Sequence, residues 1–295
     1  MASLPIDCAS ADLVADFERR ARRFETPCGD GVLVWRAWGD GPPVLLAHGS
    51  HGAWSHWIRN IDALAATRTV WAPDLPGYGE SAMAARADQD AIADALALGL
   101  RQLVGLPLDV VGFSFGGVAC AYLAANHPDI VRRLIIVGAG GLNTPLGHVK
   151  MRRLRGVEGE ARREILRANL LALMLHHPQS ADELALHLQV TNGLRARLVP
   201  SPLVLPDKLL QALPRITAQI DAIWGEHDRP HPVAAGQEPV LRRFQPELEF
   251  RVIADAGHWA MYERPADFNR TLLELLDQPP TARGNRTNAP SPPSG

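Results

Sequence analysis

The hydrophobic pattern of the chain switches between short apolar runs and longer stretches with helical spacing. The short runs predict buried strands at residues 44–47, 68–72, 108–111, 134–137, 220–224 and 248–253. The longer stretches, with apolar residues every three or four positions, predict helices at residues 57–66, 88–104, 118–125 and 265–276. Strands that alternate with helices favour a mostly parallel sheet covered on both faces.

The N-terminal part of the chain has a different pattern. Leu13, Val14 and Phe17 fit one side of a short amphipathic helix in an N-terminal extension, residues 1–22. Two strand-like segments, 23–26 and 32–38, then flank Gly29-Asp30-Gly31, which predicts an antiparallel hairpin. The hairpin opens the predicted core, which we expect to comprise residues 23–141 and 218–277.

Between the two parts of this core, strand-like runs are missing. Residues 142–217 instead contain helix-like stretches at 148–156, 159–176, 180–195 and 206–213. Ser180 to Glu183 is typical of a helix start with a capping-box glutamate. We expect this block to form a helical cap over the ends of the strands. The tail, 278–295, is rich in Pro, Ser, Asn and Thr and is expected to be disordered.

Composition narrows the class of protein. The chain has 295 residues, 46% of them hydrophobic, and a formal net charge of −2, so charge gives no reason to expect a nucleic-acid or membrane partner. Cys8, Cys28 and Cys120 lack metal-ligand spacing and are expected to be free thiols. Since neither a signal-peptide core nor a long apolar segment is apparent, we expect a cytoplasmic protein. The oligomeric state cannot be inferred.

The strongest chemical signal is Gly112-Phe113-Ser114-Phe115-Gly116. It follows the predicted strand 108–111 and precedes the predicted helix 118–125. A serine on a sharp strand-to-helix turn is the nucleophile elbow, with small residues on either side to permit the close approach of strand and helix. We therefore predict that Ser114 is a nucleophile.

A serine hydroxyl needs a base, and the base needs a third group that fixes its tautomer. In hydrolases with a nucleophile elbow the acid and then the histidine follow along the chain. Asp228 and His258 each come after a later predicted strand, which fits this order. Glu226 and Asp255 are the alternative acids, and Asp255 ranks lower because of its closeness in sequence to His258.

An oxyanion hole requires two converging donors. The backbone N–H of Phe115, directly after the nucleophile, is one candidate, and that of Ser50, in the glycine-bearing loop after strand 44–47, is the other. We interpret His48 as a residue that braces this loop and Asp74 as one that ties the loop 73–81.

A substrate pocket is expected to include His51, Trp54, Phe113 and Trp259. His56, Trp57 and Tyr262 are near the same motifs in sequence, and the sequence does not decide between pocket and core for them.

Together these motifs resemble the α/β-hydrolase superfamily from about residue 23 to residue 276. The matching pieces are His48-Gly49, the loop 74–81, the Ser114 turn, Gly225-Glu226-His227-Asp228 and Gly257-His258. The resemblance implies an eight-stranded, mostly parallel sheet flanked by helices, with a helical cap inserted after the sixth strand and no metal or organic cofactor. Serine at the nucleophile position argues against the haloalkane dehalogenase and epoxide hydrolase branches.

Two features resemble the meta-cleavage-product hydrolases, which cut carbon–carbon bonds. They are Gly257-His258-Trp259 followed by Glu263 and Phe268-Asn269, and the polar loop 48–52. That branch usually has asparagine before the nucleophile, where this chain has Phe113, and Gly-Pro-Gly in the loop, where this chain has His51-Gly52-Ala53. A cap arginine binds the substrate carboxylate in that branch, and the candidates here are Arg152, Arg153, Arg155, Arg163, Arg195 and Arg197.

The apolar surroundings of Ser114 favour a serine esterase acting on a small or medium carboxylic ester. Hydrolysis of the carbon–carbon bond in a 2-hydroxy-6-oxo-dienoate, a diketone-type substrate, is the alternative. A non-catalytic binding protein with the same fold is a third hypothesis, which the intact set of Ser114, Asp228 and His258 argues against.

Overall fold

The computed structural model describes residues 7–279 and contains one eight-stranded sheet. The strand order is β1-β2-β4-β3-β5-β6-β7-β8, and both pairings of β2 are antiparallel while the others are parallel. The strands are β1 (Arg22–Cys28), β2 (Gly31–Trp38), β3 (Pro43–Ala47), β4 (Thr69–Pro73), β5 (Leu108–Phe113), β6 (Val131–Val137), β7 (Gln219–Gly225) and β8 (Phe250–Ile253). The predicted fold class is confirmed.

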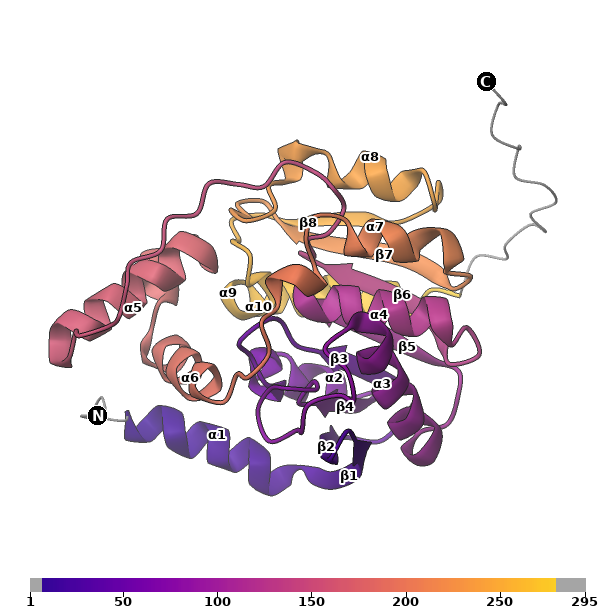
Figure 1. Cartoon of the computed structure of the whole chain (residues 1–295), viewed down its shortest axis with the longest axis horizontal. Coiled ribbons are helices and arrows are strands. Elements are labelled where there is room, and N and C mark those ends of the chain that lie inside the picture. The colour runs from indigo at the N-terminus through magenta and orange to yellow at the C-terminus, as the bar shows by residue number, and fades with distance from the viewer. Residues whose placement is uncertain (1–6, 280–295) are drawn as a thin grey trace.

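Helices cover both faces of this sheet (Figure 1). The α-helices are α1 (Cys8–Arg20), α2 (Ile61–Ala65), α3 (Gln89–Leu103), α4 (Phe115–Asn126), α5 (Gly159–Leu173), α6 (Glu183–Leu194), α7 (Lys208–Ala212), α8 (Gln237–Arg242), α9 (Ala260–Glu263) and α10 (Pro265–Asp277). Within residues 7–279, no helix combines the length and the apolar character needed to cross a bilayer.

Side-chain alternation along the strands explains why there are two apolar layers. In β3, Leu45 joins the cluster formed with α3, α4, α7 and α8, whereas Val44 and Leu46 join the cluster formed with α1, α2, α9 and α10. Successive side chains of a strand point to opposite faces, so a strand buried on both faces must be apolar throughout. β3 meets this requirement, and it lies next to β5 in the middle of the sheet.

The segment between β6 and β7 carries α5 and α6, which lie beside the sheet in Figure 1 rather than across its faces. α5 and α6 pack on each other, and α6 also packs on α1. α7 comes from the same segment but packs on α4, and its Leu209 and Ala212 belong to the apolar cluster of the sheet. From here on, "cap" means α5, α6 and the short segment between them.

Two predictions for residues 142–217 were wrong in detail. Residues 148–156 form no helix, because their polar backbone groups have another partner: Asn169 of α5 accepts the N–H of Arg152 and donates to its carbonyl, at 2.7 and 2.9 Å. The start of α6 is capped by Asp182, which accepts the N–H of Ala185 at 2.9 Å, and not by Ser180.

Other boundaries also differ from the predictions. The predicted helix 57–66 is a 3₁₀ turn, Trp54–Trp57, followed by α2, and α8 and α9 were not predicted. The N-terminal helix is present as α1, with Phe17 buried. Of the tail, residues 280–295 lie outside the described residues, so the expected disorder is untested.

Candidate active site

Ser114 lies on the turn between β5 and α4, in a backbone conformation that a residue with a side chain rarely adopts (φ 51°, ψ −115°). Its own N–H donates to the carbonyl of Val137 at 2.8 Å, which fixes the turn to β6. A Cβ on Gly112 would lie 2.4 Å from the carbonyl oxygen of Gly116, so strand and helix approach too closely for a side chain there. The strain is held by surrounding packing and presents the Ser114 side chain at the carboxyl end of β5.

His258 and Asp228 complete a hydrogen-bonded chain with Ser114. The Nε2 atom of His258 lies 3.1 Å from Ser114 Oγ, and its Nδ1 atom lies 2.8 Å from Asp228 Oδ2. Both side chains are buried, at 5% and 2% relative exposure. A carboxylate can only accept, so Asp228 requires the proton on Nδ1 and leaves Nε2 as the acceptor facing the serine hydroxyl.

The loops after β6 and β7 hold Asp228 in place. Its second oxygen, Oδ1, accepts the N–H of His231 at 2.9 Å. Gly138, after β6, has φ 52°, and a Cβ there would lie 3.0 Å from Asp228 Oδ2 and 3.3 Å from His258 Nδ1. The residue type at 138 therefore protects the contact between the acid and the histidine.

The two alternative acids face elsewhere. Glu226 accepts the N–H of Asp255 at 3.0 Å, and Asp255 lies near His177 and Arg264 at 3.7 and 3.5 Å. The hydrogen bonds found for these two carboxylates in residues 7–279 do not include His258. The geometry thus favours Asp228 as the partner of His258.

The loop after β3 approaches the Ser114 turn closely. A Cβ on Gly49 would lie 2.8 Å from the ring of Phe113 and 3.3 Å from the Cβ of Ser114. The N–H of Gly52 donates to the carbonyl of Gly49 at 3.2 Å, which closes a tight turn with Ser50 at its first inner position. Phe115 is the first residue of α4, and an N–H at that position has no acceptor within the helix. These positions are compatible with the predicted oxyanion donors.

Two buried histidines brace this loop. His48 Nε2 accepts the N–H of Leu75 at 2.8 Å, which links the loops after β3 and β4, and burial lowers the pKa of His48. His56 Nδ1 accepts the N–H of Gly49 at 3.3 Å, and burial, followed by the neighbouring His48 and His258, lowers the pKa of His56 well below its ordinary value. Both rings accept a backbone N–H, a role that a neutral imidazole fills.

The four predicted pocket residues occupy different places. The ring of Phe113 lies 4.9 Å from that of His258, and Trp259 packs against His56 at 5.0 Å, so both adjoin the site. Trp54 is directed away to α1, where its indole donates to Glu18 at 3.0 Å. The side chain of His51 is exposed.

Sequence reasoning missed several residues that position the site. Glu263 is buried, and its carboxylate accepts the N–H groups of His176, His177 and Gly257 at 2.7 to 2.9 Å. It therefore joins the cap to the turn that carries His258. Its position shortly after Gly257-His258 marked Glu263 as part of a motif. Its role as an acceptor for N–H groups of the cap could not be predicted, because the motif contains no residue of the cap.

Several candidate arginines of the cap region are already paired. Arg163 binds the carboxylate of Glu183 at 2.6 Å, and Arg197 donates to carbonyl oxygens of the loop 79–81. Arg195 lies 3.7 Å from Glu80 and is exposed. Arg152, Arg153 and Arg155 lie in the irregular segment before α5.

Comparison with known proteins assigns the family. The model of the alpha/beta hydrolase family matches residues 44–271, and the chain belongs to this family.

Among curated relatives, the chain is 28% identical over 263 residues to a 2-hydroxy-6-oxo-6-phenylhexa-2,4-dienoate hydrolase of Burkholderia cepacia, covering 81% of this chain and 88% of that protein. It is 30% identical over 258 residues to a 2-hydroxy-6-oxononadienedioate/2-hydroxy-6-oxononatrienedioate hydrolase of Paraburkholderia phymatum, covering 80% and 87%.

Solved structures share the fold. A meta-cleavage product hydrolase from Pseudomonas fluorescens IP01 matches with a TM-score of 0.70 at 22% identity, over 85% of this chain and 96% of that one. An esterase from Exiguobacterium antarcticum matches with a TM-score of 0.71 at 20% identity, over 87% and 100%. The chain is therefore a hydrolase of the α/β type, and its structural neighbours include both activities.

Proposed function

We propose that the protein is a serine hydrolase in which Ser114 is the nucleophile, His258 the general base and Asp228 the residue that orients His258. The observation that carries this proposal is the hydrogen-bonded chain from Ser114 Oγ through His258 to Asp228, at 3.1 and 2.8 Å. The three residues come from loops after β5, β8 and β7, so an extensive packed sheet holds their relative positions.

The mechanism follows from this arrangement. Ser114 Oγ attacks a substrate carbonyl while its proton passes to His258 Nε2, and the N–H groups of Ser50 and Phe115 stabilise the oxyanion. Collapse of the tetrahedral adduct breaks the bond to the leaving group, which receives the proton from His258. Water, activated by the same histidine, then releases the acid and restores Ser114.

For the substrate we propose a 2-hydroxy-6-oxo-dienoate, the class named for the curated relatives at 28% and 30% identity. In this reaction the carbonyl under attack is the 6-oxo group, and the bond that breaks joins it to C5. Before the attack, the proton of the 2-hydroxyl group is transferred to C5, which converts the dienol into its 2,6-dioxo form. The carbanion left at C5 is then stabilised by conjugation with the 2-oxo acid, and it takes its proton from His258. Addition of water across one carbon–carbon bond thus gives two acids.

Carboxylic esters are the second candidate, supported by the surroundings of Ser114. Phe113 and Phe115 flank the nucleophile, and both are buried at 1% relative exposure. Arg163 and Arg197, which could receive a substrate carboxylate, are engaged with protein groups. An ester without a second carboxylate needs no such arginine.

Stopped-flow kinetics with two substrate types tests both the proposed catalytic residues and the proposed substrate class. Decay of the coloured dienol is followed for the 6-phenyl dienoate, and p-nitrophenol release for short and medium esters. Ser114→Ala should lower turnover of any accepted substrate by on the order of 10⁶-fold, whereas the cap serine control Ser180→Ala should retain it.

Faster carbon–carbon cleavage than ester cleavage supports the dienoate class, and the reverse supports the esterase. Full activity of Ser114→Ala, or turnover of neither substrate by the wild type, would contradict the proposal.

A further inference from the structure

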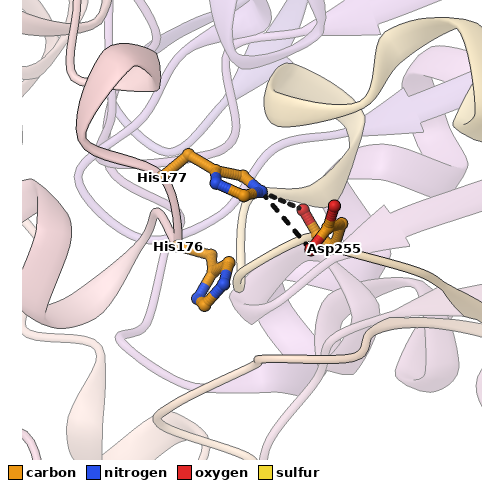
Figure 2. Close-up of side chains that lie close together, drawn as sticks. All are labelled: His176, His177 and Asp255. Carbon is orange, nitrogen blue, oxygen red and sulfur yellow. Dashed lines mark hydrogen bonds and ion pairs between the residues drawn. The ribbon is translucent and has the colours of Figure 1, made fainter.

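Apart from the Ser114 site, histidines gather where the cap meets the sheet domain. His176 and His177 follow α5, and Asp255 follows β8 (Figure 2). His227, which follows β7, stacks on His176. His227 directly precedes Asp228, and Asp255 lies three residues before His258. The cluster therefore connects one segment of the cap with two loops that carry the proposed catalytic residues.

Three of these side chains have the spacing of metal ligands. One ligand atom each from His176, His177 and Asp255 lies within 4.8 Å of the others. His177 Nε2 lies 3.7 Å from Asp255 Oδ1 and 3.0 Å from the carbonyl oxygen of Asp255 (Figure 2). Bonds of about 2.0–2.1 Å in a tetrahedron place ligand atoms about 3.3 Å apart. The side chain of Asp255 is exposed and those of His176 and His177 are half-buried, which leaves room for the rotations that this geometry needs.

The imidazole rings of this cluster pack against one another. The rings of His176 and His227 are stacked, with centroids 3.7 Å apart and planes at 21°, and the ring of His177 is 4.6 Å from that of His176. The stack holds the ring of His176 in place beside His177.

The backbone of the cluster is fixed before any ligand arrives. Glu263 accepts the N–H groups of both His176 and His177, and the N–H of Trp259 donates to the carbonyl of Met174 at 2.7 Å. Glu226 accepts the N–H of Asp255 at 3.0 Å. Arg264 lies 3.5 Å from Asp255 Oδ2, the oxygen that does not face His177. The other oxygen, Oδ1, lies on the side of His177. Such preorganisation lowers the cost of binding.

We propose that His176, His177 and Asp255 bind a divalent transition metal such as Zn²⁺ or Ni²⁺, which fastens the cap to the loops after β7 and β8. Two nitrogen ligands and one carboxylate suit these ions, whereas Ca²⁺ and Mg²⁺ prefer oxygen alone. Water fills the remaining positions, and His227 supports the ring of His176 by stacking. The site is separate from Ser114 and has a structural role.

Calorimetric titration with ZnCl₂ and NiCl₂ tests the site, using the full chain with Cys8→Ser to remove an exposed thiol. We expect one equivalent to bind, to raise the melting temperature and to slow amide exchange in residues 174–177. His177→Gln and Asp255→Asn should each weaken binding by about 100-fold or more, since loss of an outer-shell partner alone costs 10–100-fold.

The variants are chosen to remain folded. Glutamine at 177 can still donate to the carbonyl of Asp255, which lies 3.0 Å from His177 Nε2, and asparagine tolerates the φ of 59° at position 255. His127→Gln, at a histidine paired with Asp94 at 2.9 Å, is the matched control and should bind metal like the wild type. Equal affinity in wild type and His177→Gln, or no binding at millimolar metal, would overturn the proposal.

Discussion

The loops around Ser114 and the cap beside them are built in different ways. Ser114, Asp228 and His258 are held by close packing: a Cβ on Gly112 would lie 2.4 Å from the carbonyl oxygen of Gly116, and one on Gly138 would lie 3.0 Å from Asp228 Oδ2. Between α5 and α6 of the cap, the polar links include ion pairs that are partly open to solvent, such as Arg163 with Glu183, whose side chains are 20% and 43% exposed. The loops around Ser114 are fixed by close packing, whereas α5 and α6 are joined by side chains that can adjust. We therefore expect the proposed catalytic residues to tolerate less change than the cap, which we expect to contribute to substrate choice.

The largest expected effect tests the packed region. Asp228→Asn keeps the shape of the side chain and the acceptor for the N–H of His231, but its amide would donate to His258 Nδ1. The histidine would then carry its proton on Nε2 and could not accept one from Ser114. We expect kcat/KM to fall on the order of 10⁴-fold with little loss of stability.

Steady-state kinetics and thermal melts measure both quantities. The matched controls are Glu226→Gln and Asp255→Asn, the alternative acids, and each should change kcat/KM by less than about tenfold. A larger effect of Asp255→Asn than of Asp228→Asn would assign the acid to the loop after β8.

The difference between the regions also explains what the sequence could predict. Ser114, Asp228 and His258 each follow an apolar strand at a glycine-bearing junction, so order along the chain and strand-end placement predicted their proximity. The roles of Glu263 and His231 depend on backbone N–H groups brought close by folding. Local patterns do not contain such contacts.

The helix predicted at 148–156 failed for the same kind of reason. Helical spacing was present, but Met151 remains 48% exposed, and Asn169 pairs with the backbone of Arg152. A long-range contact replaced the local hydrogen bonds. In the sheet, by contrast, the continuous apolar runs fit strands that are buried on both faces, and the strand predictions were confirmed.

Glu263→Gln breaks the link between the two regions. An amide offers one acceptor oxygen to three N–H groups and adds a donor that faces them. We expect the free energy of unfolding to fall by about 1–3 kcal/mol, with faster amide exchange at residues 174–177. Chemical denaturation and hydrogen exchange provide the measurement. Glu226 accepts a single N–H, so the control Glu226→Gln should lose less free energy of unfolding. Equal losses in the two variants would contradict the role of Glu263 in joining the cap to the turn that carries His258.

His231 makes the packed region sensitive to acid. Burial, followed by the nearby His258, lowers the pKa of His231 from 6.5 to about 4. Between these values the unfolded chain binds a proton that the folded chain does not, so stability falls as the pH drops from about 6.5 to about 4, by up to about 1.4 kcal/mol per pH unit for this group. Denaturation midpoints measured across this range should show a shallower slope for His231→Gln. The exposed control His148→Gln should keep the wild-type slope, and an unchanged slope in His231→Gln would contradict this account.

The smallest effect is expected in the cap. Arg163→Gln removes an ion pair between α5 and α6 that is partly open to solvent, and such pairs contribute about 0–1 kcal/mol. If Arg163 stays with Glu183 during turnover, KM for the dienoate should change less than about threefold, and the exposed control Arg19→Gln should behave alike. Kinetics at two salt concentrations separate the cases, because binding of a substrate carboxylate by Arg163 would weaken with salt in the wild type and not in the variant. A rise in KM above about tenfold with unchanged kcat would instead show that the arginine leaves Glu183 to bind substrate, and that the cap rearranges where the loops around Ser114 do not.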